Sequence, residues 1–325
     1  MMTVMNYRKA IAEGIGRALR SDQRVVFLGE DVGAAGGAFK STVGLYEEFG
    51  PDRVWDTPIS EQAIVGAAMG AAMTGLRPIA EIMFTDFLGV CWDMVANQVA
   101  KARYMSGGQL EVPLVIRAHG GAGLGFGAQH SQTWENLLMS IPGIKVAAPS
   151  TPRDVIGLLA AAVADPDPVI LLEHKALFDA KEDVPDEPFL EPLGSASIRR
   201  TGDDLTLVAL SAMVPVAVQA AATLEAEHGI SAEVIDLRSV TPTDTATLLQ
   251  SVERTSRLMT VEENPRPCGW GAEIASIVAE EGFTFLDAPI QRVTSANVPV
   301  PFAANLEHAT IPNADTVVKA VLSYS

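Results

Sequence analysis

Glu61 is the acidic residue whose setting most suggests chemistry. It follows Pro58 and Ser60 and precedes a run of small residues from Ala63 to Gly75. Pro58 stiffens the entry to a helix and Ser60 can cap it, which places Glu61 in the first helical turn. By spacing alone, the best interpretation of Glu61 is a carboxylate that complements the positive end of the helix dipole.

Three more side chains follow predicted strands, where open α/β sheets hold their sites. Glu30 and Phe87 each come shortly after an apolar strand, and His130 ends a glycine-rich loop after another. An imidazole can move a proton near neutral pH, although a lone histidine is usually structural. Taken alone, Phe87 is an ordinary core residue, and Glu30 is either a ligand-binding acid or a structural carboxylate in a turn.

The glycine-rich loop also matches a dinucleotide-binding pattern, G-x-G-x-x-A, at Gly123, Gly125 and Ala128. That pattern needs a helix opening at its last small residue and an acid about 20 residues later, at the end of the next strand. Here His130-Ser131-Gln132 follows, and the next strand ends at Ala147-Ala148-Pro149 without an acid. We therefore predict a tight, closely approaching loop rather than an NAD site.

Short apolar strands alternate with helical patterns, which predicts an α/β fold with mainly parallel sheets flanked by helices. An amphipathic helix is expected from Tyr7 to Leu19. In the first part we expect strands at 25–28, 79–84, 112–117, 144–148 and 169–172, and helices at 88–103 and 152–164. In the second part we expect strands at 205–210, 232–237, 258–261 and 290–294, and helices at 214–227, 244–252, 270–281 and 315–322.

The segment 179–204 interrupts this alternation. It is rich in Pro, Asp, Glu and Gly, a composition typical of linkers. We therefore expect one domain at 1–180, a linker at 181–203 and a second domain at 204–325.

Composition narrows the function classes. The net charge of -17 argues against a nucleic-acid partner, and no apolar run reaches the roughly 18 residues that cross a membrane. Cys91 and Cys268 are the only cysteines, so neither a disulfide framework nor a cysteine zinc site is expected. Because the N-terminal helix region contains Glu13 and Asp22, it does not suggest a transit peptide, and the cytoplasm is the default compartment.

Six segments, in family order, resemble the beta chains of thiamine-diphosphate-dependent dehydrogenase components of 2-oxo acid and acetoin dehydrogenase complexes. These chains have a transketolase-like pyrimidine-binding domain followed by a transketolase C-terminal domain. The six segments are Gly29-Glu30-Asp31-Val32, Asp56-Thr57-Pro58-Ile59-Ser60-Glu61, Gly75-Leu76-Arg77-Pro78-Ile79, Tyr104-Met105-Ser106-Gly107-Gly108, Gln129-His130-Ser131-Gln132 and Pro142-Gly143-Ile144-Lys145-Val146.

The resemblance implies a role for each of the residues introduced above. Glu61 would bind the pyrimidine ring nitrogen of thiamine diphosphate and favour the tautomer that activates the cofactor. Phe87 would stack on the aminopyrimidine, with Ile59 beside the cofactor. His130 would face the reaction centre and assist acyl transfer to a lipoyl group. Glu30 resembles an acid near the cofactor, and a structural role in its turn stays equally open.

A potassium site is also implied by the resemblance. The ligands would be the backbone carbonyls of Leu114, Ala162 and Val163, together with Asp165 and Asp167. Relatives often have Asn where this chain has Asp167, so a helix-ending turn without metal is an equal alternative.

The sequence lacks the Gly-Asp-Gly segment with which thiamine enzymes hold the diphosphate and its magnesium. By the resemblance, an alpha subunit supplies that half, so we expect an α₂β₂ heterotetramer with the cofactor and Mg²⁺ between chains. The expected further partner is the lipoyl-bearing acyltransferase. The candidate subunit contact is a face of small residues: Gly66, Ala67, Gly70, Ala71 and Gly75.

The substrate is harder to predict from this sequence, because a beta chain contacts only part of it. The stretches 83–93 and 173–178 resemble acetoin dehydrogenase beta chains, so acetoin is favoured over pyruvate or a branched 2-oxo acid. The alternatives outside this class are the C-terminal half of a split transketolase and a non-catalytic assembly subunit. The joint presence of Glu61, Phe87 and His130 argues against the second of these.

Overall fold

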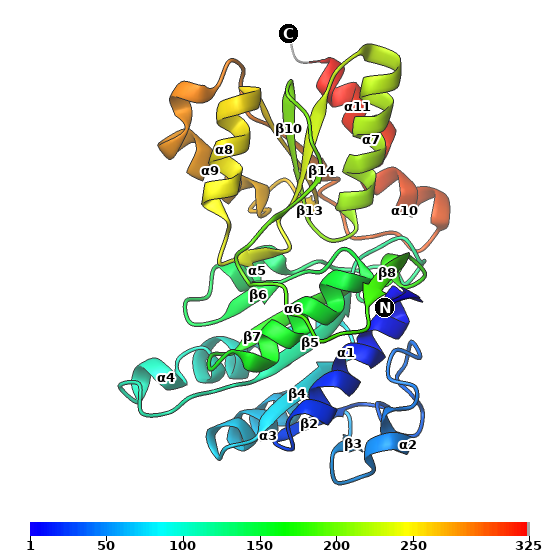
Figure 1. Ribbon diagram of the computed structural model, residues 1–325, viewed down its shortest axis with the longest axis vertical. Coiled ribbons are helices and arrows are strands. Elements are labelled where there is room, and N and C mark those ends of the chain that lie inside the picture. Colours follow the sequence, from blue (N-terminus) through cyan, green and yellow to red (C-terminus); the bar gives the residue numbers. More distant parts are fainter. Residues whose placement is uncertain (324–325) are drawn as a thin grey trace.

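A seven-stranded sheet organises the first half of the molecule, in the lower part of Figure 1. In this computed structural model, which describes residues 1–323, its strand order is β12-β6-β7-β5-β4-β2-β3. The strands are β2 (Val25–Gly29), β3 (Val54–Asp56), β4 (Arg77–Ile82), β5 (Val115–Gly120), β6 (Lys145–Ala147), β7 (Val169–His174) and β12 (Ser239–Thr241). Neighbours are parallel except β12, which reaches across from the second half and pairs antiparallel with β6.

The second half contains a five-stranded sheet with the order β14-β13-β10-β11-β9. Its strands are β9 (Ser197–Arg200), β10 (Leu205–Ala209), β11 (Ala232–Asp236), β13 (Leu258–Pro265) and β14 (Gln291–Ser295), and only β9 is antiparallel to its neighbour. A separate ribbon pairs β1 (Met2–Asn6) with β8 (Lys181–Pro185).

Helices cover both faces of each sheet. On one side of the molecule, α1 (Tyr7–Ser21) and α6 (Pro152–Ala164) cover the seven-stranded sheet. On the same side, α7 (Met213–His228) and α11 (Ala314–Leu322) cover the five-stranded sheet (Figure 1). The other side carries α3 (Glu61–Met73) and the π-helix η2 (Met94–Val99), with α8 (Thr245–Thr255) and α9 (Gly271–Glu281). The shorter helices are α2 (Leu45–Phe49), α4 (Ala102–Met105), α5 (Glu135–Met139), α10 (Ala304–Thr310), η1 (Thr85–Gly89), η3 (Lys175–Leu177) and η4 (Phe283–Phe285).

Each side has its own hydrophobic core, and each core contains residues from both halves. One cluster joins Ile15 of α1 to Ala217 of α7, and the other joins Val65 of α3 to Leu248 of α8. Because apolar packing is continuous from one half to the other, we expect the halves to be held in a fixed relation.

The α/β class and the mainly parallel sheets confirm the sequence expectation, and the helix predicted at 152–164 has those bounds. The single helix predicted at 88–103 is wrong. The chain there forms η1, η2 and α4, and the Ala100 amide bonds to the Val95 carbonyl five residues back, which widens the turn. Ser60 precedes α3 but forms no capping hydrogen bond with its side chain.

The segment 179–204 also holds two strands that the sequence did not predict, β8 and β9. Both are charged edge strands, with sequences KEDVP and SIRR, so they lack the apolar alternation that signals a strand. Their partners are supplied from far along the chain: β1 for β8, and β11 for β9.

Gly143, just before β6, offers a test of this packing. Its φ is +104°, and an added Cβ would lie 1.9 Å from the Ala100 carbonyl oxygen, whereas Gly229 has φ +66° and nothing within 4 Å of such a Cβ. Gly229→Ala should cost about 1–2 kcal/mol from the left-handed conformation alone. Gly143→Ala should lower the thermal unfolding temperature markedly more, because its backbone must also move. Equal shifts would contradict this packing.

Candidate active site

Two buried carboxylates stand at the carboxyl edge of the seven-stranded sheet. Glu30 follows β2, Glu61 opens α3, and each is only 6% exposed. Within residues 1–323 neither side chain has a hydrogen bond or an ion pair, and Glu30 Oε1 is fully buried without a partner. Burial, followed by the charges of Glu61 and Asp31, raises the pKa of Glu30. Such groups are costly to bury unpaired, so this edge calls for a donor from outside the chain.

Cys91 connects Glu61 to Phe87. Burial, and then the charge of Glu61, raises the pKa of the Cys91 thiol to about 12. Its Sγ lies 3.8 Å from the Phe87 carbonyl and 3.6 Å from that of Leu88. Cys91 is therefore an inert thiol in the wall of the site, in contact with the Phe87 backbone and within reach of the Glu61 charge.

Aromatic rings join Phe87 to His130. The two rings meet edge to face with centroids 5.3 Å apart, and His130 also packs edge-on against Phe84 at 4.6 Å. Between the same two loops, the Gln132 side chain donates from Nε2 to Asp86 Oδ1 at 2.7 Å. The loops after β4 and β5 thus bring Phe87 and His130 to the edge where Glu30 and Glu61 lie.

Ile59 lies differently from these four residues. It occupies the loop before α3 and is 82% exposed, so it is not part of the buried cluster. A large apolar side chain exposed beside unpaired buried carboxylates suits a surface that another molecule covers. Its contact with a cofactor stays a prediction.

The glycine-rich loop that resembled a dinucleotide site binds a protein carboxylate instead. Glu307 of α10 accepts the backbone N–H of Gly123 at 2.8 Å and that of Gly125 at 3.0 Å. Both glycines have positive φ, +103° and +70°, a conformation that turns successive amides toward one anion. The loop is tight, as the sequence predicted, whereas no pattern in the sequence pointed to Glu307.

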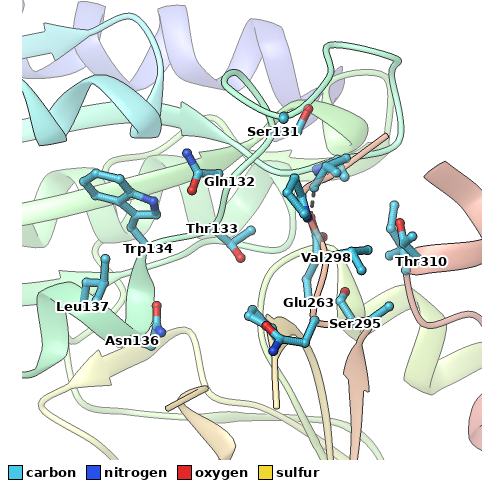
Figure 2. Close-up of a pocket in the computed structure, with 18 residues that line it drawn as sticks. Ser131, Gln132, Thr133, Trp134, Asn136, Leu137, Glu263, Ser295, Val298 and Thr310 are labelled. Atoms are coloured by element: carbon cyan, nitrogen blue, oxygen red, sulfur yellow. Dashed lines mark hydrogen bonds between the residues drawn. The ribbon is translucent and has the colours of Figure 1, made fainter. Parts of the chain in front are cut away.

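A cavity of about 440 Å³ separates the two halves beside this loop (Figure 2). The first half contributes the segment from Ser131 to Leu137, and the second half contributes Glu263 and the segment from Ser295 to Val300. Since Ser131 and Gln132 directly follow His130, the cavity borders the loop that carries His130.

Beneath the site lies a buried ionic cluster. Arg117 of β5 forms ion pairs with Glu81 of β4 and Glu173 of β7, with 3.1 Å between Arg117 Nε and Glu173 Oε1. His119 Nε2 lies 2.9 Å from the Arg117 guanidinium, and its Nδ1 lies 3.0 Å from the Met83 carbonyl. Burial and the Arg117 charge hold the pKa of His119 well below its usual range, so the ring is a neutral acceptor toward Arg117.

Glu135 of α5, near the cavity, predicts a pH effect on stability. Burial raises its pKa from 4.5 to about 7, while Asn264 of the second half donates to it at 3.1 Å. Between pH 4.5 and about 7 the folded state keeps a proton that the unfolded state loses, so this group's contribution to stability falls as pH rises. The unfolding temperature of Glu135→Gln relative to the natural chain should therefore climb over this range and level off above it. A constant difference would contradict the assignment.

Four of the five predicted potassium ligands lie at the end of α6, and Leu114 lies just before β5. The chain's own cations engage the two carboxylates of this set. Lys145 Nζ lies 2.6 and 2.7 Å from the two oxygens of Asp165, and Arg103 lies 2.7 Å from Asp167.

Each of the three predicted carbonyl ligands already accepts a hydrogen bond. The carbonyl of Leu114 accepts the first amide of β7 at 3.0 Å, that of Ala162 accepts the amide ending its helix at 3.3 Å, and that of Val163 accepts from Arg77. To bind these carboxylates, potassium would have to compete with the Lys145 ammonium and the Arg103 guanidinium. Across the described residues, no group of three or more His, Cys, Asp or Glu could hold a metal ion. Potassium binding stays a prediction.

Comparisons with known proteins agree with this fold. Residues 3–180 match the transketolase pyrimidine-binding domain, and residues 194–317 match the transketolase C-terminal domain. A split-gene transketolase, solved as an inactive beta4 tetramer, superposes with a TM-score of 0.82 over 98% of both chains at 24% identity, which shows the shared fold. The chain is therefore a two-domain protein of the transketolase type.

Sequence relatives define the family more closely. The beta subunit of acetoin:2,6-dichlorophenolindophenol oxidoreductase from Bacillus subtilis is 48% identical over 99% of this chain and 97% of its own. The counterpart from Cupriavidus necator is 47% identical over 98% and 97%. Beta-1 of the mitochondrial pyruvate dehydrogenase E1 component from Arabidopsis thaliana is 47% identical over 97% and 88%.

The chain belongs to the beta-subunit family of thiamine-diphosphate-dependent acetoin and pyruvate dehydrogenase components, which are oxidoreductases. Membership implies an alpha subunit as its partner. Among residues 1–323, no helix is long and apolar enough to cross a membrane.

Proposed function

We propose that this chain supplies the pyrimidine-side half of an active site that cleaves acetoin and passes the acetyl group to lipoamide. The observation that carries the proposal is the pair of buried carboxylates, Glu30 and Glu61, without a donor in the described part of the chain. An aminopyrimidine fits that need, because it offers a ring nitrogen and an amino group to acidic partners and a flat face to an aromatic ring.

Each residue then has a task. Glu61 shares a proton with the pyrimidine ring nitrogen, Phe87 packs against the ring, and Glu30 lies beside them. Bound thiamine diphosphate supplies the carbanion chemistry that opens the substrate's carbon–carbon bond. His130 moves the proton that accompanies acyl transfer, and its two ring contacts hold it over the same edge.

The overall reaction balances without another oxidant. Acetoin and the disulfide of lipoamide give acetaldehyde and S-acetyl-dihydrolipoamide, in which one sulfur carries the acetyl group and the other a proton. The two electrons that oxidise the acetyl carbon reduce the disulfide. The lipoyl group would be presented by the acyltransferase partner.

The alpha subunit would hold the diphosphate and Mg²⁺ in an α₂β₂ assembly. The surface of α3 supports such a contact: Ala67 and Gly70 are exposed, and an added Cβ at Gly70 would meet nothing within 4 Å. An apolar groove of about 280 Å³ runs beside this helix, between Trp55 and Ala71. Close helix packing there would cover Ile59 as well.

Acetoin rather than a 2-oxo acid is supported by the two acetoin-type relatives and by the segments 83–93 and 173–178. Pyruvate is the second candidate, favoured by the plant relative at nearly equal identity. The test is dye reduction by the reconstituted alpha–beta pair with acetoin, pyruvate and a branched 2-oxo acid in parallel. Turnover with acetoin is the expected result, and activity confined to 2-oxo acids would overturn it. Turnover with sugar phosphates would instead favour the split-transketolase alternative.

A further inference from the structure

The loop that carries His130 is held by residues to which the proposed function gives no role. We propose that Lys175 and Glu307 are positioning residues that fix this loop so that His130 can serve acyl transfer. The inference rests on the proposed function for the role of His130, but the contacts that hold the loop stand independently of it.

The loop by itself has little to define its shape. Four of its eleven residues, 121–131, are glycine, and Leu124 and Phe126 are exposed at its tip. Glycine-rich segments lose much conformational freedom on ordering, so external contacts must supply the compensation. Here those contacts come from charged side chains that are themselves buried.

Glu307 is the anchor at the loop's first turn. It lies on α10 in the second half, is 1% exposed, and accepts from Gly123 and Gly125 with both of its oxygens. Hydrogen bonds from backbone amides to an ionised carboxylate are shorter and stronger than neutral ones. Glu263 of β13 adds a parallel contact by accepting the Ala122 amide at 2.8 Å. The second half of the chain therefore sets the course of a loop in the first.

Lys175 is the anchor at the loop's other end. It begins η3, is 1% exposed, and its Nζ donates to the His130 carbonyl oxygen at 2.8 Å. The ammonium lies 5.5 Å from the Phe84 ring centroid and 5.6 Å from that of Phe126, a cation–π geometry. Because Phe84 also packs against the His130 ring, Lys175 fixes the backbone of His130 while Phe84 fixes its imidazole.

Three carboxylates act on the charge state of the Lys175 ammonium. Burial lowers the pKa of Lys175 to about 8, and the negative charges of Asp86, Glu263 and Glu307 oppose that shift. Lys175 is therefore cationic at neutral pH. The cation at one end of the loop and the carboxylates at the other are electrostatically coupled, so losing either should loosen the same loop.

Two variants of the assembled alpha–beta complex test the inference: Glu307→Gln and Lys175→Met. Each is assayed with acetoin in two ways, by dye reduction and by acetylation of free lipoamide. We expect kcat for lipoamide acetylation to fall roughly 10- to 100-fold, the size of loss that a misplaced group produces. Dye reduction should change about twofold at most, and Lys175→Arg should recover part of the lost transfer.

Matched controls separate positioning from general damage. Glu233 is also 1% exposed in the second half but pairs with Arg254, and Lys101 donates to the Pro142 carbonyl away from the loop. Glu233→Gln and Lys101→Met should leave the ratio of the two rates unchanged. A proportional fall of both rates in Glu307→Gln and Lys175→Met would overturn the inference.

His130→Gln, run alongside, distinguishes this inference from the proposed function. If His130→Gln loses lipoamide acetylation while both anchor variants keep it, positioning is wrong and the role of His130 stands. If His130→Gln changes neither rate, the proposed role of His130 fails. Limited proteolysis then tests whether Lys175 and Glu307 hold the loop. Faster cleavage within 121–131 in the anchor variants than in the controls then supports the anchoring, and equal cleavage rejects it.

Discussion

Glu61→Gln is expected to lower turnover of the assembled complex by about 10²- to 10⁴-fold, the range for losing a positioned proton-transfer group. The glutamine keeps the size and burial of the side chain but cannot share a proton as a carboxylate does. Subunit assembly should be unchanged, because Glu61 makes no hydrogen bond or ion pair within residues 1–323. Steady-state kinetics with gel filtration would measure both properties.

Glu47 is the matched control for Glu61. It also lies in the first turn of a helix, α2, but it is exposed. If Glu61 served only to complement a helix dipole, Glu61→Gln and Glu47→Gln would both leave turnover intact and cost at most about 1 kcal/mol of stability. Unchanged turnover in Glu61→Gln would also support the non-catalytic assembly subunit.

The largest loss of stability is expected from Arg117→Met. The guanidinium is fully buried between Glu81 and Glu173, so its removal leaves two carboxylates and the neutral His119 without their shared partner. Breaking a buried ion pair from one side typically costs about 3–5 kcal/mol. Denaturant unfolding of the complex should show a loss of that order.

A second variant makes this test specific. Adding Glu173→Gln to Arg117→Met removes one of the stranded charges, so the double variant should be more stable than Arg117→Met alone. If the double variant lost the sum of the two single effects, the ion pairs would not be the source of the stability.

The fold class could be predicted from the sequence because the apolar periodicity of the central elements is strong. Val25–Gly29 and Pro152–Ala164 carry clear strand and helix patterns. Charged edge strands such as Lys181–Pro185 could not be predicted this way, because their pairing depends on a segment nearly the whole domain away. The π-helix at Met94–Val99 could not be predicted either, because such helices are rare and the pattern there favoured an α-helix.

Candidate site residues could be predicted where a side chain capable of chemistry or stacking follows a strand. Glu30, Phe87 and His130 all follow strands, and the roles proposed for them come from the resemblance. The anchors of the His130 loop were not predictable, because Glu307 lies far along the chain and reaches the loop only through the packing of the two halves. The buried ion cluster left a fainter signal: Glu81 and Arg117 each interrupt an apolar strand, and they face each other in register.

Binding of thiamine diphosphate, measured by calorimetry on the isolated chain and on the reconstituted alpha–beta complex, tests the shared site most directly. With magnesium present, we predict saturable binding to the complex, weaker binding when that complex carries Glu61→Gln, and no measurable binding to the isolated chain. Tight binding and turnover by the isolated chain would contradict the account, since all the groups needed to hold the cofactor would then lie within one polypeptide.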